Sequence, residues 1–493
     1  MGNENMDIRP SRAEAAKIGE GYRRVPVAGT MPTSGLTPAE CFLKFKRLSK
    51  QCFILESLED EADTGRYTFI GYDPITEITC KDGLVRIRGG ADIEIKTNDP
   101  GAQIRSLIAS NKAPAVAGLP PFTGGLVGYF AYDYIKYAEP VIELGEEDVE
   151  DFRDVDLMLF DKAVAFDRLE ATISFIVNIR MDAFEENYNR ALSEIESMRR
   201  IAMGGEKAEP GKLRLTSQWR PLFGHGKFAG MVRAAKRHIF EGDIFQAVLS
   251  NRLECDAEGS LYETYRRLSE INPSPYMFYF SSDDVEIAGA APETLVKLRG
   301  DRLETFPLAG TRARGGTPAE DKALEAELLA DPKELAEHNM LVDLGRNDIG
   351  RISKFGSVGV DQYMSIERFS HVMHIGSTVS GTIRDDKDAI DAIEALLPAG
   401  TLSGAPKIRA CQIIGALEGK RRGIYGGAVG YIGLNGDMDT CIAIRIAYKK
   451  NGRVFIRSGA GIVADSVPEN EYDECRRKLA AVVEALEGGG GRE

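Results

Sequence analysis

Several features are missing from this 493-residue sequence, and each absence excludes a class of protein. No long basic run is present and the net charge is −14 at pH 7, which argues against a nucleic-acid partner. No apolar run is long enough to cross a membrane, and the N-terminus lacks the apolar core of a signal peptide. We therefore expect a cytoplasmic protein without membrane association.

Paired cysteine motifs are also missing. The seven cysteines are odd in number, lie far apart in the chain and include no C-x-x-C pair. This distribution is typical of reduced thiols in an intracellular protein and excludes a disulfide framework or a zinc-binding cluster of cysteines.

The strand and turn pattern indicates the fold class. Asn435 and Gly436, and later Asn451 and Gly452, are strong hairpin turns between apolar runs, and residues 440–448 read as one strand. Because hairpins outnumber strand-helix-strand units, we expect an α+β protein with mostly antiparallel or mixed sheets covered by helices, and not a Rossmann fold. The length permits two or more domains, or one unit with large sheets.

One glycine-rich stretch, residues 203–212, is the best candidate for a linker. It separates an N-terminal region, residues 21–202, from a second region, residues 213–487. Residues 1–20 are polar and are expected to be poorly ordered, as is a glycine-rich tail at residues 488–493.

A glutamate pair on a predicted helix is the first sign of chemistry. In residues 333–348, Glu334 and Glu337 share one helical face with Leu341 and Leu344, so the carboxylates continue an apolar stripe. Desolvated carboxylates take up protons or require a cation, and two of them one turn apart suit a hard divalent ion such as magnesium. A capped helix with solvated glutamates is the alternative.

A second pair opens the last predicted helix. Glu471, Glu474 and Lys478 again share one face, and two such helices are able to hold one metal ion through direct and water-mediated contacts. Acidic residues in a first helical turn also compensate the helix dipole without any metal.

Two further positions suggest anion binding. Arg445 stands among small residues on one face of its strand, which leaves room for a carboxylate ligand held by two hydrogen bonds; an interior ion pair is equally consistent. Gly459, Ala460 and Gly461 follow a strand and allow backbone N–H groups to approach an anion, although short glycine-rich loops are common.

Three residues are candidates for proton transfer. His371 and His374 would point to opposite faces of a strand, so a shared metal is not expected, and a lone strand histidine is usually structural. Glu293 follows an apolar stretch in which burial would raise its pKa and suit it to act as a general acid; an exposed strand end is the alternative.

Taken together, these segments resemble the chorismate-binding enzymes, and most closely those that form anthranilate. The resemblance runs from about Tyr22 to Leu486 and rests, besides the glutamate helix, on residues 242–246 (GDIFQ), 292–295 (PETL), 307–312 (PLAGTR), 400–407 (GTLSGAPK), 425–427 (YGG) and 468–474 (PENEYDE). It implies a four-layered α/β sandwich of large, mostly antiparallel sheets covered by helices, built around a magnesium-dependent chorismate site.

The resemblance also implies roles for single residues. Glu334, Glu337, Glu471 and Glu474 would surround Mg²⁺. Glu293 would protonate the departing C4 hydroxyl of chorismate, and His374 would lie beside the ring, as a proton acceptor or as an orienting group. The residues implied in substrate binding are Ala309, Gly310, Thr311, Thr401, Tyr425, Arg445, Gly459, Ala460, Gly461 and Lys478.

Two positions separate the branches of the family. Aminodeoxychorismate synthases place a nucleophilic lysine where Ala309 stands, and enzymes that add water at C2 place a lysine where Gln246 stands. Neither lysine is present, which favours ammonia as the nucleophile and anthranilate and pyruvate as the products. No cysteine lies in the glycine-flanked turn of a glutamine amidotransferase, so a separate amidotransferase subunit, and hence a hetero-oligomer, is implied.

A feedback site for tryptophan is implied by the same resemblance. Its residues would be Leu55, Glu56, Ser57, Asn272, Pro273, Pro275, Tyr276, Met277 and Cys441. Without the resemblance, a turn at a domain interface is the simpler interpretation. An aminodeoxychorismate synthase and a non-catalytic tryptophan-sensing homologue are the alternatives to an anthranilate-forming enzyme.

Overall fold

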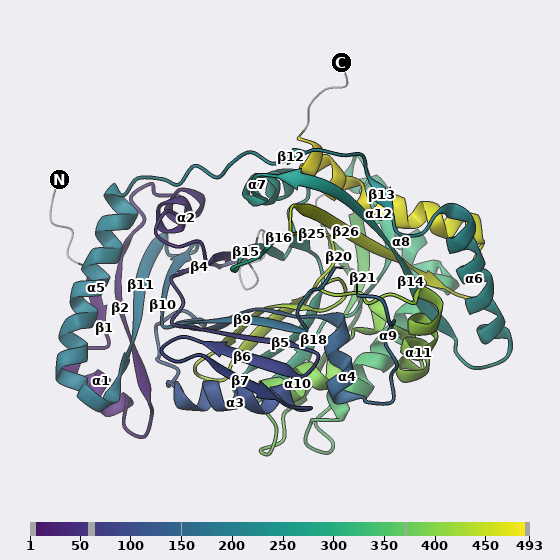
Figure 1. Ribbon diagram of the computed structural model, residues 1–493. Coiled ribbons are helices and arrows are strands. Elements are labelled where there is room, and N and C mark those ends of the chain that lie inside the picture. The colour runs from purple at the N-terminus through teal and green to yellow at the C-terminus, as the bar shows by residue number, and fades with distance from the viewer. Residues whose placement is uncertain (1–5, 58–64, 149, 370–371, 489–493) are drawn as a thin grey trace.

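The computed structural model describes residues 6–57, 65–148, 150–369 and 372–488 and consists of two large sheets with helices on their outer faces (Figure 1). Every pair of neighbouring strands within the two sheets is antiparallel. The strand-rich, mostly antiparallel architecture predicted from the hairpin turns is confirmed.

The first sheet has 14 strands within the described residues. In spatial order these are β1 (Asp7–Arg9), β2 (Arg24–Pro32), β11 (Thr172–Arg180), β10 (Lys162–Asp167), β4 (Tyr67–Tyr72), β3 (Cys52–Glu56), β15 (Tyr276–Ser281), β16 (Val285–Ala291), β25 (Ile446–Lys450), β26 (Arg453–Ile462), β14 (Gln246–Glu258) and β12 (Arg214–Leu215), with β13 (Arg220–Pro221) and β22 (Gly404–Ala405) also paired to β14.

The second sheet has 12 strands within the described residues. In spatial order these are β19 (Leu308–Ala313), β21 (Val372–Thr382), β18 (Arg302–Thr305), β17 (Thr294–Arg299), β24 (Met438–Ile442), β23 (Ala428–Gly433), β8 (Gly125–Phe130), β9 (Val155–Phe160), β5 (Thr76–Lys81), β6 (Leu84–Arg88) and β7 (Ile93–Lys96), with β20 (Gly359–Arg368) also paired to β21.

The helices connect and cover these strands. They are α1 (Arg12–Ile18), α2 (Pro38–Lys46), α3 (Pro100–Ser110), α4 (Ile135–Ala138), α5 (Phe184–Gly204), α6 (His225–Phe240), α7 (Tyr262–Ile271), α8 (Pro318–Ala330), α9 (Pro332–Gly350), α10 (Ala389–Leu396), α11 (Lys407–Glu418) and α12 (Pro468–Glu487), with 3₁₀ turns η1 (Tyr132–Tyr134), η2 (Met181–Ala183) and η3 (Gly400–Leu402).

The buried side chains arrange these elements in four layers. Because side chains alternate along a strand, Phe53 of β3 and Tyr129 of β8 lie in the core between the sheets, whereas Ile54 and Phe130, one residue along, face the helices. Helices α2, α5, α7 and α12 cover the first sheet, and α3, α9 and α10 cover the second. Figure 1 shows α7 and α12 above the sheets and α3 and α10 below them.

Neighbouring strands pass from one sheet to the other at two points. The chain leaves β16 in the first sheet and enters β17 in the second across Pro292 and Glu293. The partner strands do the reverse, from β24 to β25, across residues 443–445. The single strand predicted for residues 440–448 is therefore wrong, because the chain changes sheets there and Arg445 has a left-handed backbone with φ of 54°.

The two regions on either side of the predicted linker contribute to the same sheets. Strand β3 pairs with β15, and β8 pairs with β23, so each sheet joins residues from both regions. The stretch between α5 and β12, residues 205–213, contains neither helix nor strand.

The expectation that residues 1–20 are poorly ordered is wrong from residue 6 onward. Strand β1 pairs with β2, and α1 begins with a capping box in which Ser11 and Glu14 bond to each other's backbone N–H groups. Ala15 of α1 is fully buried in the core of the first sheet. Residues 1–5 lie outside the described part of the chain, as does most of the predicted glycine-rich tail.

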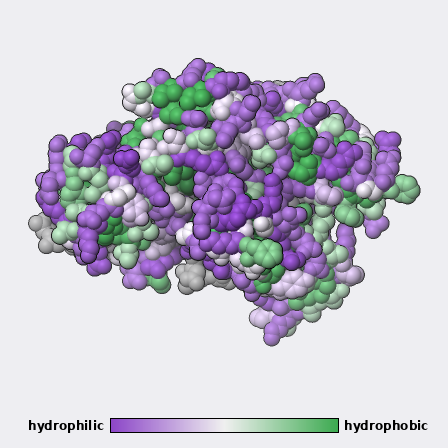
Figure 2. All heavy atoms as spheres, turned by 90° about the horizontal axis from the view of Figure 1, so that it is seen from below, coloured by the Kyte–Doolittle hydropathy of each residue, from purple (hydrophilic) through white to green (hydrophobic). Residues whose placement is uncertain are grey.

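The surface agrees with the composition. The face in Figure 2 is mostly hydrophilic, with apolar residues in small separate patches. In the described residues, no helix is both long enough and apolar enough to cross a membrane. All seven cysteines are buried and unpaired, so the prediction of free thiols is confirmed.

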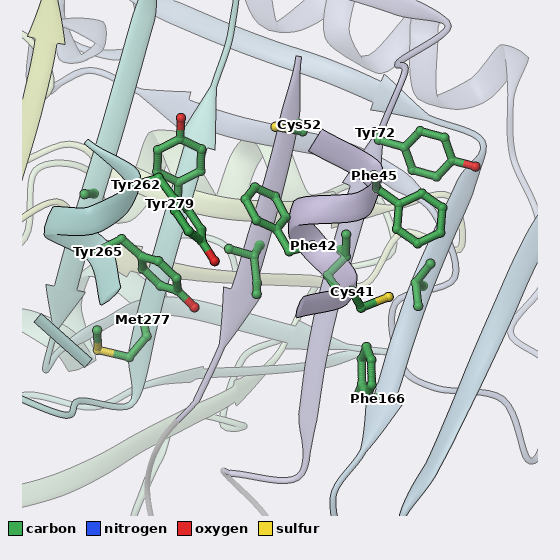
Figure 3. Close-up of a cluster of buried hydrophobic side chains, with 14 of the residues drawn as sticks. Cys41, Phe42, Phe45, Cys52, Tyr72, Phe166, Tyr262, Tyr265, Met277 and Tyr279 are labelled. Carbon is green, nitrogen blue, oxygen red and sulfur yellow. The ribbon is translucent and has the colours of Figure 1, made fainter. Parts of the chain in front are cut away.

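An aromatic cluster joins helices from the two regions. Phe42 of α2 stacks on Tyr262 of α7, with ring centroids 5.4 Å apart, and meets the edge of Tyr279 of β15 at 5.7 Å (Figure 3). Phe42 is fully buried. Aromatic pairs of this kind contribute beyond their buried area, so the cluster fastens α2 to the second region.

Replacing Phe42 tests this contact. We expect Phe42→Ala to lower the free energy of unfolding by about 3–5 kcal/mol, because it leaves a cavity between α2 and α7. Leu48→Ala is the control, since Leu48 is 56% exposed, and its effect is expected to stay within about 0.5 kcal/mol. Urea unfolding followed by the fluorescence of Trp219 measures both, and equal midpoints for the two variants would contradict the assignment.

Candidate active site

The two glutamate helices face one cavity. Glu334 and Glu337 of α9 and Glu471 and Glu474 of α12 all line a cavity of about 540 Å³, within the usual size range of small-molecule sites. Leu341 lines it as well, whereas Leu344, the last residue of the predicted stripe on α9, does not. The structure thus brings together two pairs that lie more than 130 residues apart in the sequence.

The four carboxylates are only partly neutralised by the protein. Burial raises the pKa of Glu337, and the nearby charges of Glu334 and Glu474 raise it further. Burial also raises the pKa of Glu471. Lys478 lies 2.7 Å from Glu474 and donates to the Gly459 carbonyl at 3.1 Å. An all-oxygen wall with this excess of negative charge fits a hard divalent cation such as Mg²⁺.

The glutamate oxygens do not form a tight cage. Among the described residues, only His238, Glu241 and Asp243 have three ligand atoms within 4.8 Å of one another. That group is exposed or half-buried, and Asp243 is already bound by Arg409 at 2.9 Å. A cation at the glutamate wall would therefore be held partly through water, as Mg²⁺ usually is.

Arg445 supplies positive charge elsewhere on the cavity wall. It is half-buried, burial lowers its pKa, and within the described residues its guanidinium has neither an ion pair nor a hydrogen bond. The alternative of an interior ion pair is therefore not observed. A left-handed backbone in a residue other than glycine is strained, and such strain is common at binding sites.

Glu293 is buried, as the apolar stretch before it in the sequence predicted. It lies where the chain crosses between the sheets, is 7% exposed, and burial raises its pKa to about 8. Thr401 of η3 donates to both carboxylate oxygens, at 3.1 and 3.2 Å. At neutral pH this side chain is mostly protonated and able to act as an acid.

His374 lies on β21 and also lines the cavity. Its Nδ1 is 2.8 Å from the carbonyl oxygen of Gly310, which only accepts, so Nδ1 carries the hydrogen and Nε2 is left as an acceptor. Burial lowers its pKa, which keeps the imidazole neutral. His371 lies outside the described residues.

Strand β26 forms part of the cavity wall. It contributes Arg457, Ser458, Gly459 and Gly461, whereas Ala460 is fully buried in the core beneath α6 and α11. The Ala460 side chain thus points away from the cavity, and the predicted role of residue 460 in substrate binding concerns its backbone alone.

Steric contacts explain why residues 459 and 461 are glycines. A Cβ on Gly459 would lie 2.9 Å from the hydroxyl of Tyr425, and one on Gly461 would lie 2.8 Å from Nε2 of Gln246. The cavity floor can therefore bring backbone close to both side chains only with glycine at these positions. The other predicted residues that line the cavity are Gln246, Ala309, Gly310, Thr311, Thr401, Tyr425 and Lys478.

A second cavity, of about 250 Å³, contains most of the predicted feedback residues. Its lining includes Leu55, Glu56, Ser57, Pro275, Tyr276, Met277 and Cys441. The predicted residues Asn272 and Pro273 do not line it, since they belong to the turn that leads from α7 into β15. Pro292 and Leu308 line both cavities, so the two sites share a wall.

Ser57 is the best evidence that the second cavity binds a ligand. Its hydroxyl is buried and has no hydrogen-bond partner within the described residues. Buried hydroxyls without partners are rare, because each costs roughly 1–3 kcal/mol. A ligand with a polar group would satisfy it.

Comparison with known proteins identifies the family. Residues 50–484 match the model of the chorismate binding enzyme family. The chain belongs to the chorismate-binding enzymes.

Named relatives cover the chain almost end to end. Anthranilate synthase component 1 of Acetivibrio thermocellus is 42% identical, over 98% of this chain and 99% of its own, and that of Aquifex aeolicus (strain VF5) is 43% identical, over 98% of both. The crystal structure of anthranilate synthase component I from Streptococcus pneumoniae TIGR4 superposes with a TM-score of 0.75 at 36% identity, covering 92% of this chain and 98% of the other. The four-layered chorismate-binding fold implied by the motifs is confirmed.

Some residues that line the two cavities were not predicted from the sequence. Arg457 is among them, although its spacing of two from Gly459, and of four from Gly461, on one strand was the available signal. Lys297, Asp439 and Arg66 line the second cavity. Their positions depend on pairing between distant strands, for which the sequence carries no local signal.

The raised pKa of Glu293 makes stability depend on pH. Its pKa moves from a usual value near 4.5 in the unfolded chain to about 8 in the folded chain, so between these values the folded chain binds one more proton. Stability from this group is fully present below pH 4.5 and is lost as the pH rises toward 8. Glu293→Gln, which cannot ionise, is expected to lose less stability than the wild type between pH 5 and pH 8.

Urea unfolding at pH 5 and pH 8 measures this difference. Glu469→Gln, a change of an exposed glutamate on α12, is the control and should follow the wild type. Identical pH dependence in the Glu293 variant and the wild type would show that this carboxyl is charged in the folded chain.

Proposed function

We propose that this chain is an anthranilate synthase component 1, which converts chorismate and ammonia into anthranilate and pyruvate for tryptophan biosynthesis. One observation carries the proposal: a single cavity holds a buried acid, four glutamates and an arginine that has no ion pair within the described residues, and it has no lysine at positions 246 and 309. The names of its full-length relatives support the same activity.

The glutamate wall is proposed to hold Mg²⁺. Glu334, Glu337, Glu471 and Glu474 would supply the oxygen ligands, directly or through water. The bound cation would neutralise the ring carboxylate of chorismate. Without it, the same four residues repel an anionic substrate.

The protein binds the rest of the substrate through its cations and its backbone. Arg445 presents a planar fork that makes two parallel hydrogen bonds to a carboxylate. Lys478 and the hydroxyl of Tyr425 lie in the same cavity. Gly459 and Gly461 leave space for the substrate against β26.

Glu293 and His374 divide the proton transfers. Glu293, protonated near neutral pH, donates its proton to the C4 hydroxyl, which leaves as water while ammonia adds at C2. The enolpyruvyl group then leaves as pyruvate, and loss of the C2 proton restores the aromatic ring. His374, neutral and with its Nε2 free to accept, takes that proton.

Two uncharged side chains favour anthranilate over the products of related enzymes. Ala309 offers no amine to attack C2, which argues against an aminodeoxychorismate synthase. Gln246 offers no base to activate water there. Ammonia is the remaining nucleophile.

A partner subunit is proposed to supply that ammonia. All seven cysteines are buried, and desolvation raises the thiol pKa of those at positions 41, 52, 80, 411, 441 and 475, so none of these is suited to attack glutamine. A separate glutamine amidotransferase would therefore complete the enzyme as a hetero-oligomer.

The second cavity is proposed to bind tryptophan as a feedback inhibitor. Pro275, Tyr276 and Met277 would line the indole, and Ser57 would bond to the polar end of the amino acid. Glu56 accepts a hydrogen bond from Tyr265. The wall shared at Pro292 and Leu308 gives bound tryptophan a direct mechanical path to Glu293.

Turnover of chorismate with Mg²⁺ and ammonium tests the activity. We expect anthranilate fluorescence that depends on Mg²⁺ and falls at least a hundredfold in Glu337→Gln, because a hard cation loses an anionic ligand. Glu469→Gln, on the exposed face of α12, should remain active. Undiminished turnover after exhaustive chelation would refute the metal site.

The same assay tests the partner and the alternatives. With glutamine in place of ammonium, the purified chain alone should produce no anthranilate. Aminodeoxychorismate as the product would favour an aminodeoxychorismate synthase. Tryptophan binding without any turnover would favour the sensing homologue.

The feedback site is tested at Ser57. Losing one hydrogen bond in a buried site costs about 1–3 kcal/mol, so Ser57→Ala is expected to weaken tryptophan binding roughly 5- to 150-fold. Ser274→Ala is the control, since that buried serine bonds to the Asn272 carbonyl outside the cavity. Calorimetry on both variants, with and without chorismate, gives the affinities.

Linkage sets a second expectation for this experiment. If tryptophan weakens chorismate binding, chorismate must weaken tryptophan binding by the same factor. Equal tryptophan affinity in the wild type and Ser57→Ala would remove Ser57 from the site.

A further inference from the structure

Arg422 is a fully buried cation that lies just outside the catalytic cavity. It is 1% exposed and does not line either of the two cavities described above. Four hydrogen bonds hold its guanidinium: to Glu418 at 3.1 and 2.6 Å, to the Leu402 carbonyl at 2.7 Å and to the Val248 carbonyl at 2.6 Å. A buried charge requires this degree of pairing.

The acceptors of Arg422 belong to different walls of the site. Leu402 follows Thr401, the residue that donates to both oxygens of Glu293. Val248 lines the cavity two residues after Gln246 on β14. Arg422 therefore connects the Thr401 turn, which contacts Glu293, to strand β14. This strand carries Gln246, the position at which the water-adding enzymes have a lysine.

Glu418 fixes the direction of the guanidinium. Its carboxylate is fully buried, and although burial alone raises its pKa, Arg422 and Arg457 bring the pKa below its usual value, so it stays ionised. It also accepts from Arg457 at 2.8 Å and from the backbone N–H of Ser250 at 2.8 Å. Two arginines around one carboxylate leave a net positive charge under the floor of the cavity.

The same group supports Tyr425. The guanidinium carbons of Arg422 and Arg457 lie 6.0 and 5.8 Å from the centroid of the Tyr425 ring. Tyr425 lines the cavity, while its ring rests against these two cations. A cation over an aromatic face contributes about 0.5–2 kcal/mol and restricts the ring.

We propose that Arg422 is a positioning residue for the chorismate reaction: it clamps the Thr401 turn, β14 and Tyr425 together and so holds Glu293 in line with the leaving hydroxyl. This inference rests on the function proposed above. Only arginine fits the role, because its planar fork reaches three acceptors in different directions, whereas lysine offers one compact ammonium.

The clamp also keeps water away from Glu293. If the Thr401 turn loosens, solvent reaches the carboxyl and the desolvation that raises its pKa is reduced. The acid then ionises at lower pH, and activity falls earlier as the pH rises. Other charged groups face the same cavity and are unchanged in the variants below; they are Lys333, Glu334, Glu337, His374, Arg445, Arg457, Asp465, Glu471, Glu474 and Lys478.

Arg422→Lys in the full chain is the main test, with chorismate, Mg²⁺ and ammonium. We expect kcat to fall about tenfold to a hundredfold with KM for chorismate changed by less than about threefold, because small misplacement of an acid slows chemistry more than binding. The alkaline limb of the kcat/KM profile should move to lower pH. A merely structural role would lower the melting temperature and leave that limb in place.

Arg252→Lys is the matched control. Arg252 is a buried arginine of β14 that is bound to buried Glu150, and it lines neither cavity. Its loss should lower the melting temperature without moving the alkaline limb. Glu418→Gln is the second variant, since it frees one side of Arg422 while keeping the arginine, and it should move the limb in the same direction.

A double-variant cycle tests the route through the turn. If Arg422 acts through Thr401, then Arg422→Lys combined with Thr401→Val should reduce kcat by clearly less than the product of the two single losses. Losses that multiply, or a wild-type alkaline limb in both Arg422→Lys and Glu418→Gln, would overturn the proposal. A wild-type chain without chorismate turnover would instead refute the proposed function.

Discussion

The exchange of neighbouring strands between two stacked sheets is the constraint on which the site depends. Strands β16 and β25 pair in one sheet, and their continuations β17 and β24 pair in the other. Backbone that changes sheets must leave both ladders, which opens a space between the layers. Glu293 and Arg445 stand in the two crossing segments, so the positions of the acid and of the arginine are fixed by the main chain of the paired strands on either side.

Burial affects two carboxyl groups, one on the cavity wall and one beneath it, in opposite ways. Around Glu293 it stabilises the neutral acid, whereas around Glu418 it is offset by two arginines, which keep a carboxylate ionised. Among the glutamates of the cavity, the charges of Glu334 and Glu474 raise the pKa of Glu337 further, and Lys478 and Lys333 offset this only in part. The chain as a whole is acidic, so local positive charge decides where an anion is held.

The sequence predicted best those parts of the site whose signal is local. The spacing of Glu334 and Glu337, and of Glu471 and Glu474, depends only on the helical repeat, and both pairs face the cavity. The fold class followed from hairpin turns in the same way. The side chain of Ala460 lies in the core because the side chains of a strand alternate between its two faces.

Long-range features were not predictable in this way. The break at Arg445 depends on a change of sheet, and apolar alternation continues through it, so the sequence reads as one strand. Arg422 meets the Val248 carbonyl across 174 residues, and no local pattern marks the contact. The order in residues 6–18 depends on β2 and the core beneath it. Local propensity specifies elements, whereas pairing between distant strands specifies where their ends meet.

The joining of both regions in each sheet has a consequence for biosynthesis. Strand β3 ends at Glu56, but its partner β15 begins at Tyr276, so 276 − 56 = 220 residues must be translated before that edge is paired. At typical translation rates of about 5–20 residues per second, the edge of β3 stays unpaired for roughly 10–40 s during synthesis. Unpaired strand edges are templates for aggregation, so we expect the unfinished chain to be more prone to aggregation than the complete one.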